Sequence, residues 1–269
     1  MPTCWIRSSR DCAGPRCEIL GIPVDLIDYD AAFAAIQDWR ASGSRRFVVV
    51  ESASDIQLSR DPAVRTAVRA AGLNLPDGVG VVTAARLLGH KTRGRVAGPD
   101  LMLKICDWGR AQGYRHFLYG STVDVVERLR ARLVCRYPGL DIAGFSCPPF
   151  RALTAEEDEE VVGQINACAP DVVWVGLGGA KQIQWMADHL GRVQAPVMIG
   201  VGAAFNFHAG VVRRAPSWVR RWGMEWAYRM ATEPRKILPR TRHTLLFGIR
   251  VAAQAAVWRL AGARPSRQA

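Results

Sequence analysis

Short apolar runs alternate with longer stretches of helical periodicity along most of this chain, and that alternation restricts the fold more than any other feature. It is the pattern of strands and crossover helices in a mostly parallel sheet, so we predict an α/β fold. The expected strands are 47–50, 116–119, 140–143, 172–175 and 197–200. The expected helices are 31–40, 79–88, 99–112, 122–137, 154–167 and 180–190.

Charge is distributed unevenly along the chain. The formal net charge is +12, and residues 210–269 contribute most of it, because thirteen Lys and Arg there face only Glu225 and Glu233. Such asymmetry indicates an anionic partner, either nucleic-acid phosphates or an anionic membrane surface. We therefore expect a loose leader at 1–17, an α/β body at 18–210 and a cationic appendage at 211–269.

Cysteine usage and the two ends of the chain bear on its compartment. The seven cysteines are an odd number without a CxxC pair, which predicts reduced thiols in a cytoplasmic protein. Residues 1–17 contain arginines but no continuous apolar stretch, so we do not expect a signal peptide. The apolar segment 245–263 contains Arg250 and Arg259, each costing about 2.5 to 3.5 kcal/mol at mid-bilayer, so we expect no membrane span.

Turns containing glycine follow three of the expected strands, at Gly120, at Gly176 and Gly178, and at Gly200 and Gly202. At the carboxyl ends of parallel strands such turns let backbone N–H groups approach a phosphate, although turn geometry alone also explains each glycine. A nicotinamide-dependent oxidoreductase is one alternative for an α/β chain. It needs a third glycine at the right spacing and an acidic residue about twenty positions on, and the sequence lacks this fingerprint.

Asp77 lies in the turn Leu75-Pro-Asp-Gly, after an apolar segment and before an expected helix. Its carboxylate fits two roles, the cap of that helix or a general base in a cleft. Arg95 precedes another expected helix, and Lys181 and Gln182 begin a third. These three positions suit either the binding of a diphosphate or an ordinary surface.

Metal-site and hydrolase motifs are missing from the sequence. There is no HExxH, GxSxG or Walker loop, and the five histidines are scattered, so we expect no bound metal. We interpret His208 as a half-buried histidine with a satisfied ring. The acidic run 156–160 after Thr154 is typical of a solvated helix start.

Seven segments occur together in one order along the chain. They are Leu75-Pro-Asp-Gly-Val79, Arg95-Val-Ala-Gly-Pro-Asp100, Ser146-Cys-Pro-Pro-Phe150, Gly176-Leu-Gly-Gly-Ala-Lys-Gln182 with Trp185, Gly200-Val-Gly-Ala-Ala-Phe-Asn-Phe-His-Ala-Gly210, Arg214-Ala-Pro-Ser-Trp218, and Gly223-Met-Glu-Trp226 with Tyr228-Arg229 and Glu233-Pro234. The series resembles the WecB/TagA/CpsF family, glycosyltransferase family 26, over about residues 20–240.

The resemblance implies a bacterial enzyme with a Rossmann-like fold and a helical appendage that meets the membrane. It would move a sugar from a UDP-sugar to a polyprenyl-diphosphate-linked saccharide, with inversion and without a metal or cofactor. Asp77 matches the proposed catalytic base. The implied substrate-binding residues are Ser52, Arg95, Gly176, Gly178, Lys181, Gln182 and Asn206 of the body, and Arg214, Arg221 and Arg229 of the appendage. The implied location is peripheral, at the inner face of the plasma membrane, and a homo-oligomer is left open.

The sequence departs from the family pattern near the expected donor site. Val50-Glu51-Ser52 stands where the family has Thr-x-Asn, Ile183 replaces the glutamate of Pro-Lys-Gln-Glu, and Asn206 replaces the aspartate of Phe-Asp. Donor identity therefore stays open.

The basic appendage also allows a nucleic-acid-binding interpretation. Trp218, Trp222 and Trp226 recur every four residues, so one helical face would carry three indole rings. Such rings stack on bases, but rings beside arginines are equally typical of a membrane interface, and a third interpretation packs them onto the body. With the resemblance, we favour the membrane and expect no nucleic-acid partner.

Overall fold

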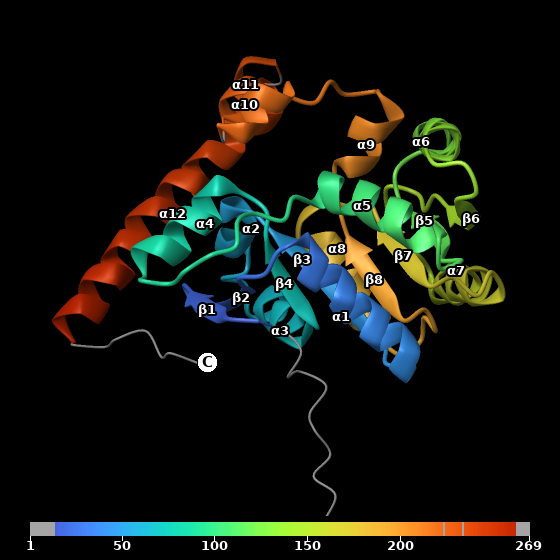
Figure 1. The fold of residues 1–269 in the computed structure, drawn as a ribbon, viewed down its shortest axis with the longest axis horizontal. Helices are drawn as coiled ribbons and strands as arrows, with labels where there is room; N and C mark the ends of the chain where they lie inside the picture. Colours follow the sequence, from blue (N-terminus) through green and yellow to red (C-terminus); the bar gives the residue numbers. More distant parts are fainter. Residues whose placement is uncertain (1–13, 223, 233, 262–269) are drawn as a thin grey trace, which may run out of the picture.

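The centre of the molecule is a six-stranded parallel sheet (Figure 1). The structure is a computed structural model and describes residues 14–222, 224–232 and 234–261. The strand order is β4 (Leu73–Pro76), β3 (Arg46–Glu51), β8 (Val197–Gly200), β7 (Val172–Val175), β5 (Arg115–Tyr119) and β6 (Asp141–Ser146). All five pairings are parallel, which confirms the predicted α/β sheet.

The central strands are buried on both faces, because successive side chains point to opposite sides of a sheet. In β3, Phe47 and Val49 face one apolar core while Val48 and Val50 face the other. The first core is covered by α2 (Ala53–Leu58), α3 (Pro62–Ala70), α4 (Val79–Leu87), α7 (Ala155–Ala167) and α8 (Gly179–Asp188). The second is covered by α1 (Tyr29–Ser42), α5 (Gly98–Arg110), α6 (Val123–Arg136) and α9 (Ala204–Ala209).

Strands β3 and β8 are neighbours in the middle of the sheet, and their connections run to opposite sides. The chain leaves β3 for the edge strand β4, whereas it reaches β8 from β7. In open parallel sheets a change of direction of this kind leaves a crevice at the carboxyl ends of the strands, where ligands bind. The fold therefore points to the ends of β3, β4 and β8 as the place for a site.

A hairpin of β1 (Arg16–Ile19) and β2 (Ile22–Asp25) precedes the sheet and was not predicted from the sequence. Asp25 connects the hairpin to β4. The fully buried carboxylate of Asp25 accepts hydrogen bonds from Arg16 Nε in β1 and from Asn74 N in β4, both at 2.7 Å. The expected leader 1–17 is thus wrong at its end, because Arg16 and Cys17 form a strand. Residues 1–13 of that leader lie outside the described residues.

Helix α9 is followed by α10 (Ser217–Arg221), α11 (Glu225–Thr232) and the 27-residue α12 (Pro234–Leu260). The inner side of α12 packs Phe247, Val251 and Ala255 into the core beside α2 and α4. Gln254 joins it to the hairpin: Leu20 N donates to its Oε1, and its Nε2 donates to the Glu18 carbonyl, both at 2.9 Å.

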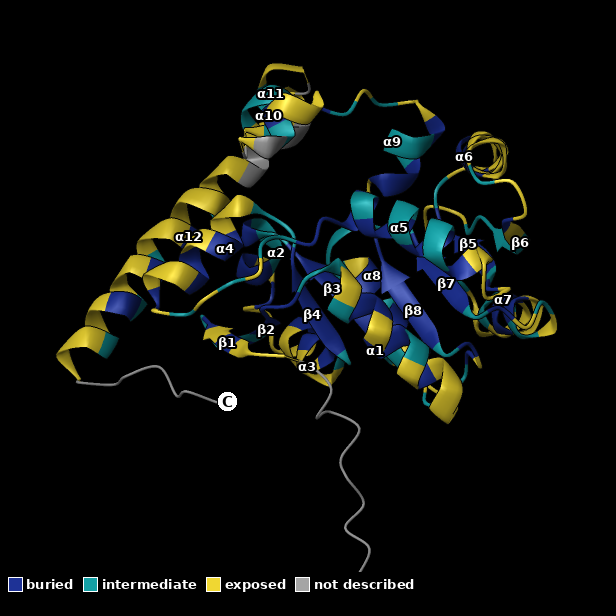
Figure 2. Cartoon of the chain, in the orientation of Figure 1, coloured by how far each residue is buried: buried dark blue, intermediate teal, exposed yellow. Residues whose placement is uncertain are grey.

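The outer side of α12 faces away from the body and is largely exposed (Figure 2). Among the side chains of this helix that the structure describes, those of Leu238, Leu245, Ile249, Val257 and Leu260 are at least 59% exposed. Over the part of the chain that the structure describes, every helix is too short or too polar to cross a membrane.

Candidate active site

The glycine turns after β5, β7 and β8 meet at the carboxyl edge of the sheet. Gly120 has a φ of 115°, and a Cβ at this position would lie 2.9 Å from the backbone carbonyl carbon of Gly176. The turns after β5 and β7 can therefore lie this close together only because residue 120 is glycine. Gly178 and Gly202 also have positive φ, at 77° and 49°. The predicted glycine turns therefore lie together where a ligand would bind.

Gln182, near the start of α8, holds two of these turns in place. Its buried Oε1 accepts hydrogen bonds from Gly178 N and Gly202 N, both at 3.1 Å. Lys181 beside it is exposed. The amide oxygen of Gln182 is therefore engaged by the protein itself, in support of the turns after β7 and β8.

Asp77 directly follows β4, and its N–H donates to the Glu51 carbonyl at 2.9 Å, which extends the pairing of β3 and β4 by one residue. The helix-cap interpretation is wrong, because the N-cap of α4 is Gly78 and no side chain caps this helix. Burial, together with nearby Glu225 and Asp55 and against the opposing effect of Arg95 and Arg214, raises the pKa of Asp77 to about 7. A carboxylate that titrates near neutral pH suits a general base.

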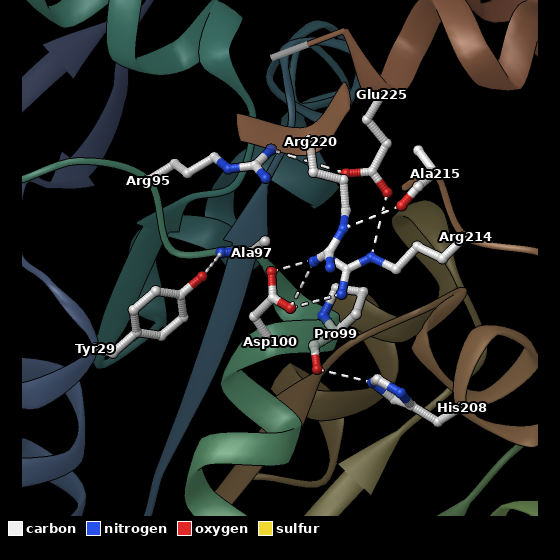
Figure 3. Close-up of polar contacts among 10 residues, drawn as sticks. All are labelled: Tyr29, Arg95, Ala97, Pro99, Asp100, His208, Arg214, Ala215, Arg220 and Glu225. Carbon is white, nitrogen blue, oxygen red and sulfur yellow. Dashed lines mark hydrogen bonds and ion pairs between the residues drawn. The ribbon is translucent and has the colours of Figure 1, made fainter. Parts of the chain in front are cut away.

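Charged residues from the segment before α5, from α5 itself and from residues 214–225 form one cluster of ion pairs (Figure 3). Asp100, in the first turn of α5, accepts two hydrogen bonds from Arg214, from Nη1 at 2.6 Å and Nη2 at 2.8 Å, and one from Arg220 Nη1 at 3.2 Å. Arg214 Nε also donates to Glu225 Oε1 at 3.4 Å, and Arg95 Nη1 lies 3.8 Å from Glu225 Oε2. The segment from α9 to α11 is thus attached by ion pairs to the body.

Burial and these contacts shift the pKa values of Asp100, His208 and Tyr29. Burial opposes ionisation of Asp100, but the hydrogen bonds and charges of its arginine partners outweigh it and lower its pKa. His208 Nε2 donates to the Pro99 carbonyl at 2.8 Å and its pKa is lowered by burial, so the interpretation of His208 as a satisfied histidine is confirmed. Tyr29 accepts from Ala97 N at 3.0 Å through its hydroxyl, and burial raises its pKa to about 12.

The other predicted binding residues have local partners of their own. Ser52 is the N-cap of α2 and forms a capping box with Asp55. The backbone carbonyl of Asn206 accepts from Val211 N and Val212 N after α9. The Arg229 guanidinium lies over the Phe207 ring, 5.5 Å from its centroid. The side chain of Arg221 lies outside the described part of the chain.

Sequence reasoning missed several charged side chains of this region. Glu51, Asp55 and Glu225 lie near Asp77, and Asp100 and Arg220 belong to the ion-pair cluster. Glu51 is fully buried, and neither of its oxygens has a hydrogen-bond partner in the described structure. Burial, with a smaller effect of Asp55, raises its pKa well above the ordinary range, which favours the neutral carboxyl. A signal existed for Glu225 alone, as one of two acids in a strongly basic segment. Among the residues that the structure describes, no three His, Cys, Asp or Glu form a group that could hold a metal ion.

Comparison with known proteins agrees with the resemblance seen in the motifs. The family model described as "Glycosyl transferase WecG/TagA/CpsF family" matches residues 17–261. An N-acetylglucosaminyldiphosphoundecaprenol N-acetyl-beta-D-mannosaminyltransferase of Bacillus subtilis (strain 168) is 31% identical over 80% of this chain and 73% of that protein.

Two further relatives have the same name. The protein of Bacillus spizizenii (strain ATCC 23059 / NRRL B-14472 / W23) is 33% identical over 65% of this chain and 66% of its own length. That of Staphylococcus aureus (strain NCTC 8325 / PS 47) is 34% identical over 60% of this chain and 61% of its own length. The matched stretches thus span about two thirds of the relatives. The match of the family model over most of the described residues establishes that the chain belongs to the WecG/TagA/CpsF family of glycosyltransferases.

Proposed function

We propose that this protein transfers a sugar from a UDP-sugar to a polyprenyl-diphosphate-linked saccharide during synthesis of a bacterial surface glycan or exopolysaccharide. The observation that carries the proposal is Asp77, a carboxylate with a pKa of about 7 at the carboxyl edge of the sheet, with Arg95 and Arg214 nearby. The names of the relatives, which include a diphosphoundecaprenol-linked sugar, support the acceptor class.

The proposed reaction is a single displacement. An acceptor hydroxyl oxygen attacks the anomeric carbon while the bond from that carbon to UDP breaks, and the bonding electrons leave with UDP. Asp77 accepts the hydroxyl proton, and attack opposite the leaving group inverts the anomeric centre. Arginines stabilise the charge that develops on the diphosphate, since a guanidinium binds phosphate oxygens through two parallel hydrogen bonds. We therefore propose that transfer needs no metal.

We further propose a donor other than UDP-N-acetylmannosamine, either a UDP-hexose or a UDP-hexuronic acid. Val50 and Ile183 are buried apolar residues at positions where the family has polar groups. A site that binds an acetamido or hydroxyl group through such partners discriminates against sugars that lack it, and their loss removes that discrimination.

The appendage supports a peripheral position at the inner face of the plasma membrane. Trp218, Trp222 and Trp226 are 67%, 79% and 61% exposed, and the outer side of α12 adds further exposed apolar residues. The third interpretation of the tryptophans, packing onto the body, is wrong for these three. Exposed indoles and aliphatic side chains within a segment of net charge +11 suit the headgroup region of an anionic bilayer.

The function is tested with purified full-length protein, a polyprenyl-diphosphate-linked N-acetylglucosamine acceptor and a panel of UDP-sugars, with and without EDTA. We expect one donor to be used, equally well with EDTA, and kcat/KM to rise with pH through about 7 as Asp77 loses its proton. Asp77→Asn keeps the shape and loses the base, so transfer should fall by roughly 10²- to 10⁴-fold while UDP binding is kept. Failure with every donor, or near-normal turnover of Asp77→Asn, would contradict the proposal.

A further inference from the structure

Glu225 opens α11 and lies between two arginines from different parts of the chain (Figure 3). Arg95 comes from the body, in the segment before α5, and Arg214 comes from the segment that joins α9 to α10. The Glu225 carboxylate contacts both, at 3.8 Å and 3.4 Å, and all three side chains are at least three-quarters buried. Glu225 is therefore the point where the appendage, its connecting segment and the body meet.

The contacts of Glu225 are longer than those of the neighbouring Asp100. Asp100 holds Arg214 through two bonds of 2.6 and 2.8 Å, within the range of strong charge-assisted hydrogen bonds. Glu225 approaches the same guanidinium only to 3.4 Å. Asp100 therefore supplies the firm attachment of Arg214, and the remaining influence of Glu225 is mainly electrostatic.

The ion pair of Arg95 and Glu225 lies beside Asp77, because Val96 N donates to the Pro76 carbonyl at 2.8 Å and so places the Arg95 segment next to the turn that holds Asp77. The groups that act on Asp77 come from separate elements: Asp55 from α2, Arg95 from the segment before α5, Arg214 from the segment before α10, and Glu225 from α11. Tyr29 of α1 also lies near Asp77, and burial raises its pKa to about 12; burial likewise raises the pKa of Glu51, which is joined to Asp77 through the backbone. Two negative charges thus oppose two positive ones, and Glu225 is the larger of the negative contributions.

We propose that Glu225 is a positioning residue that controls how strongly Asp77 holds a proton. Its carboxylate offsets the positive charge of Arg95 and Arg214, which would otherwise make Asp77 a weaker base. The effect depends on the contact of α11 with the body. The appendage would therefore influence the strength of the base as well as the charged surface around it. The catalytic meaning of this inference rests on the proposed function, but the electrostatic effect on Asp77 does not.

The test compares Glu225→Gln with Glu225→Asp in the full chain and follows the Asp77 side-chain carboxyl carbon by NMR during a pH titration, with Asp77→Asn for assignment. Removing the charge should lower the Asp77 midpoint by roughly 0.5 to 1 pH unit, and keeping it in Glu225→Asp should leave the midpoint nearer the wild type. Arg95→Gln removes a positive charge and should move the midpoint upward. Structural disturbance alone does not produce opposite shifts.

The same variants are then assayed for transfer across pH. At pH 6 the Glu225→Gln enzyme should have a kcat/KM roughly threefold above the wild type, because a larger share of Asp77 is deprotonated; at pH 8 the gain should disappear. An unchanged or higher Asp77 midpoint in Glu225→Gln would overturn the inference. Lack of transfer with every donor would overturn the proposed function instead, since the NMR titration needs no substrate.

Discussion

Trp174 of the body and three tryptophans of the appendage lie in opposite environments. Trp174 of β7 is fully buried and donates a hydrogen bond to His116 Nδ1 at 3.1 Å, whereas Trp218, Trp222 and Trp226 are mostly exposed. The body is held by two continuous apolar cores. The appendage is held by the inner side of α12 and by ion pairs at Asp100, and it leaves large apolar side chains outside. The burial of tryptophan thus distinguishes the body, whose rings stabilise the core, from the appendage, whose exposed rings are available for contact with a partner.

The largest expected effect on stability is that of truncating the buried Trp174, and the exposed Trp222 provides the comparison. Trp174→Ala removes a fully buried ring and should lower the free energy of unfolding by roughly 3 to 5 kcal/mol. Trp222→Ala, at 79% exposure, should change it by less than about 0.5 kcal/mol. Urea unfolding of both variants measures the difference. A similar loss in the two would mean that Trp222 packs against the protein and that the contrast between the regions is wrong.

A smaller effect is expected where the two regions join. Asp100→Ala leaves Arg214 and Arg220 without their shared carboxylate and should destabilise the protein by about 1 to 3 kcal/mol. Because the pKa of Asp100 is lowered in the fold, its contribution is fully present above the pKa of an unfolded aspartate, about 4, and is lost as pH falls through the lower folded pKa.

The measurement is urea unfolding of the wild type and Asp100→Ala between pH 3 and pH 8. The stability difference should stay constant from about pH 5 upward and shrink only below about pH 4. A difference that fades between pH 6 and 8 would point to another titrating group at the junction.

The smallest effect is expected on the outer side of α12. Changing Leu245 and Ile249 together to Gln should weaken binding to anionic vesicles about tenfold, because two exposed apolar side chains lose their favourable transfer into the bilayer interface. Stability should change by less than about 0.5 kcal/mol. Phe247→Ala, on the inner side, is the matched control and should destabilise the fold. Unchanged vesicle binding of the double variant, measured by co-sedimentation at the same salt, would rule out this face as the contact.

The strongly apolar strands and most helices of the body were predicted from the sequence, whereas the hairpin of β1 and β2, strand β4 and helices α2, α3 and α9 were not. Each expected strand and helix appears with its ends within three residues of the prediction. Strand β4 was missed because four residues that include Asn74 and Pro76 carry no strand periodicity; its edge position makes the proline acceptable. Helix α2 has six residues, and its one signal was the capping pair of Ser52 and Asp55.

The candidate site was only partly predictable, for a different reason. Asp77 was identified because its turn is a local motif. Its charged surroundings arise from side chains far apart in sequence: Asp100 and Arg214 are 114 residues apart, and their contact depends on how α9 leads into α10. From the sequence, Asp100 looks like any acidic residue in the first turn of a helix, where a negative charge is favourable without a further role.

Gln182 affects how mutational data on this family should be interpreted. One amide oxygen fixes the spacing between the turns after β7 and β8, so a replacement that cannot accept two hydrogen bonds releases both turns at once. Lost activity at this position would then resemble the loss of a ligand contact even if the side chain never touches the donor. A structure of the variant with UDP bound distinguishes the two causes, because it shows whether the turns have moved or only a contact with UDP has been lost.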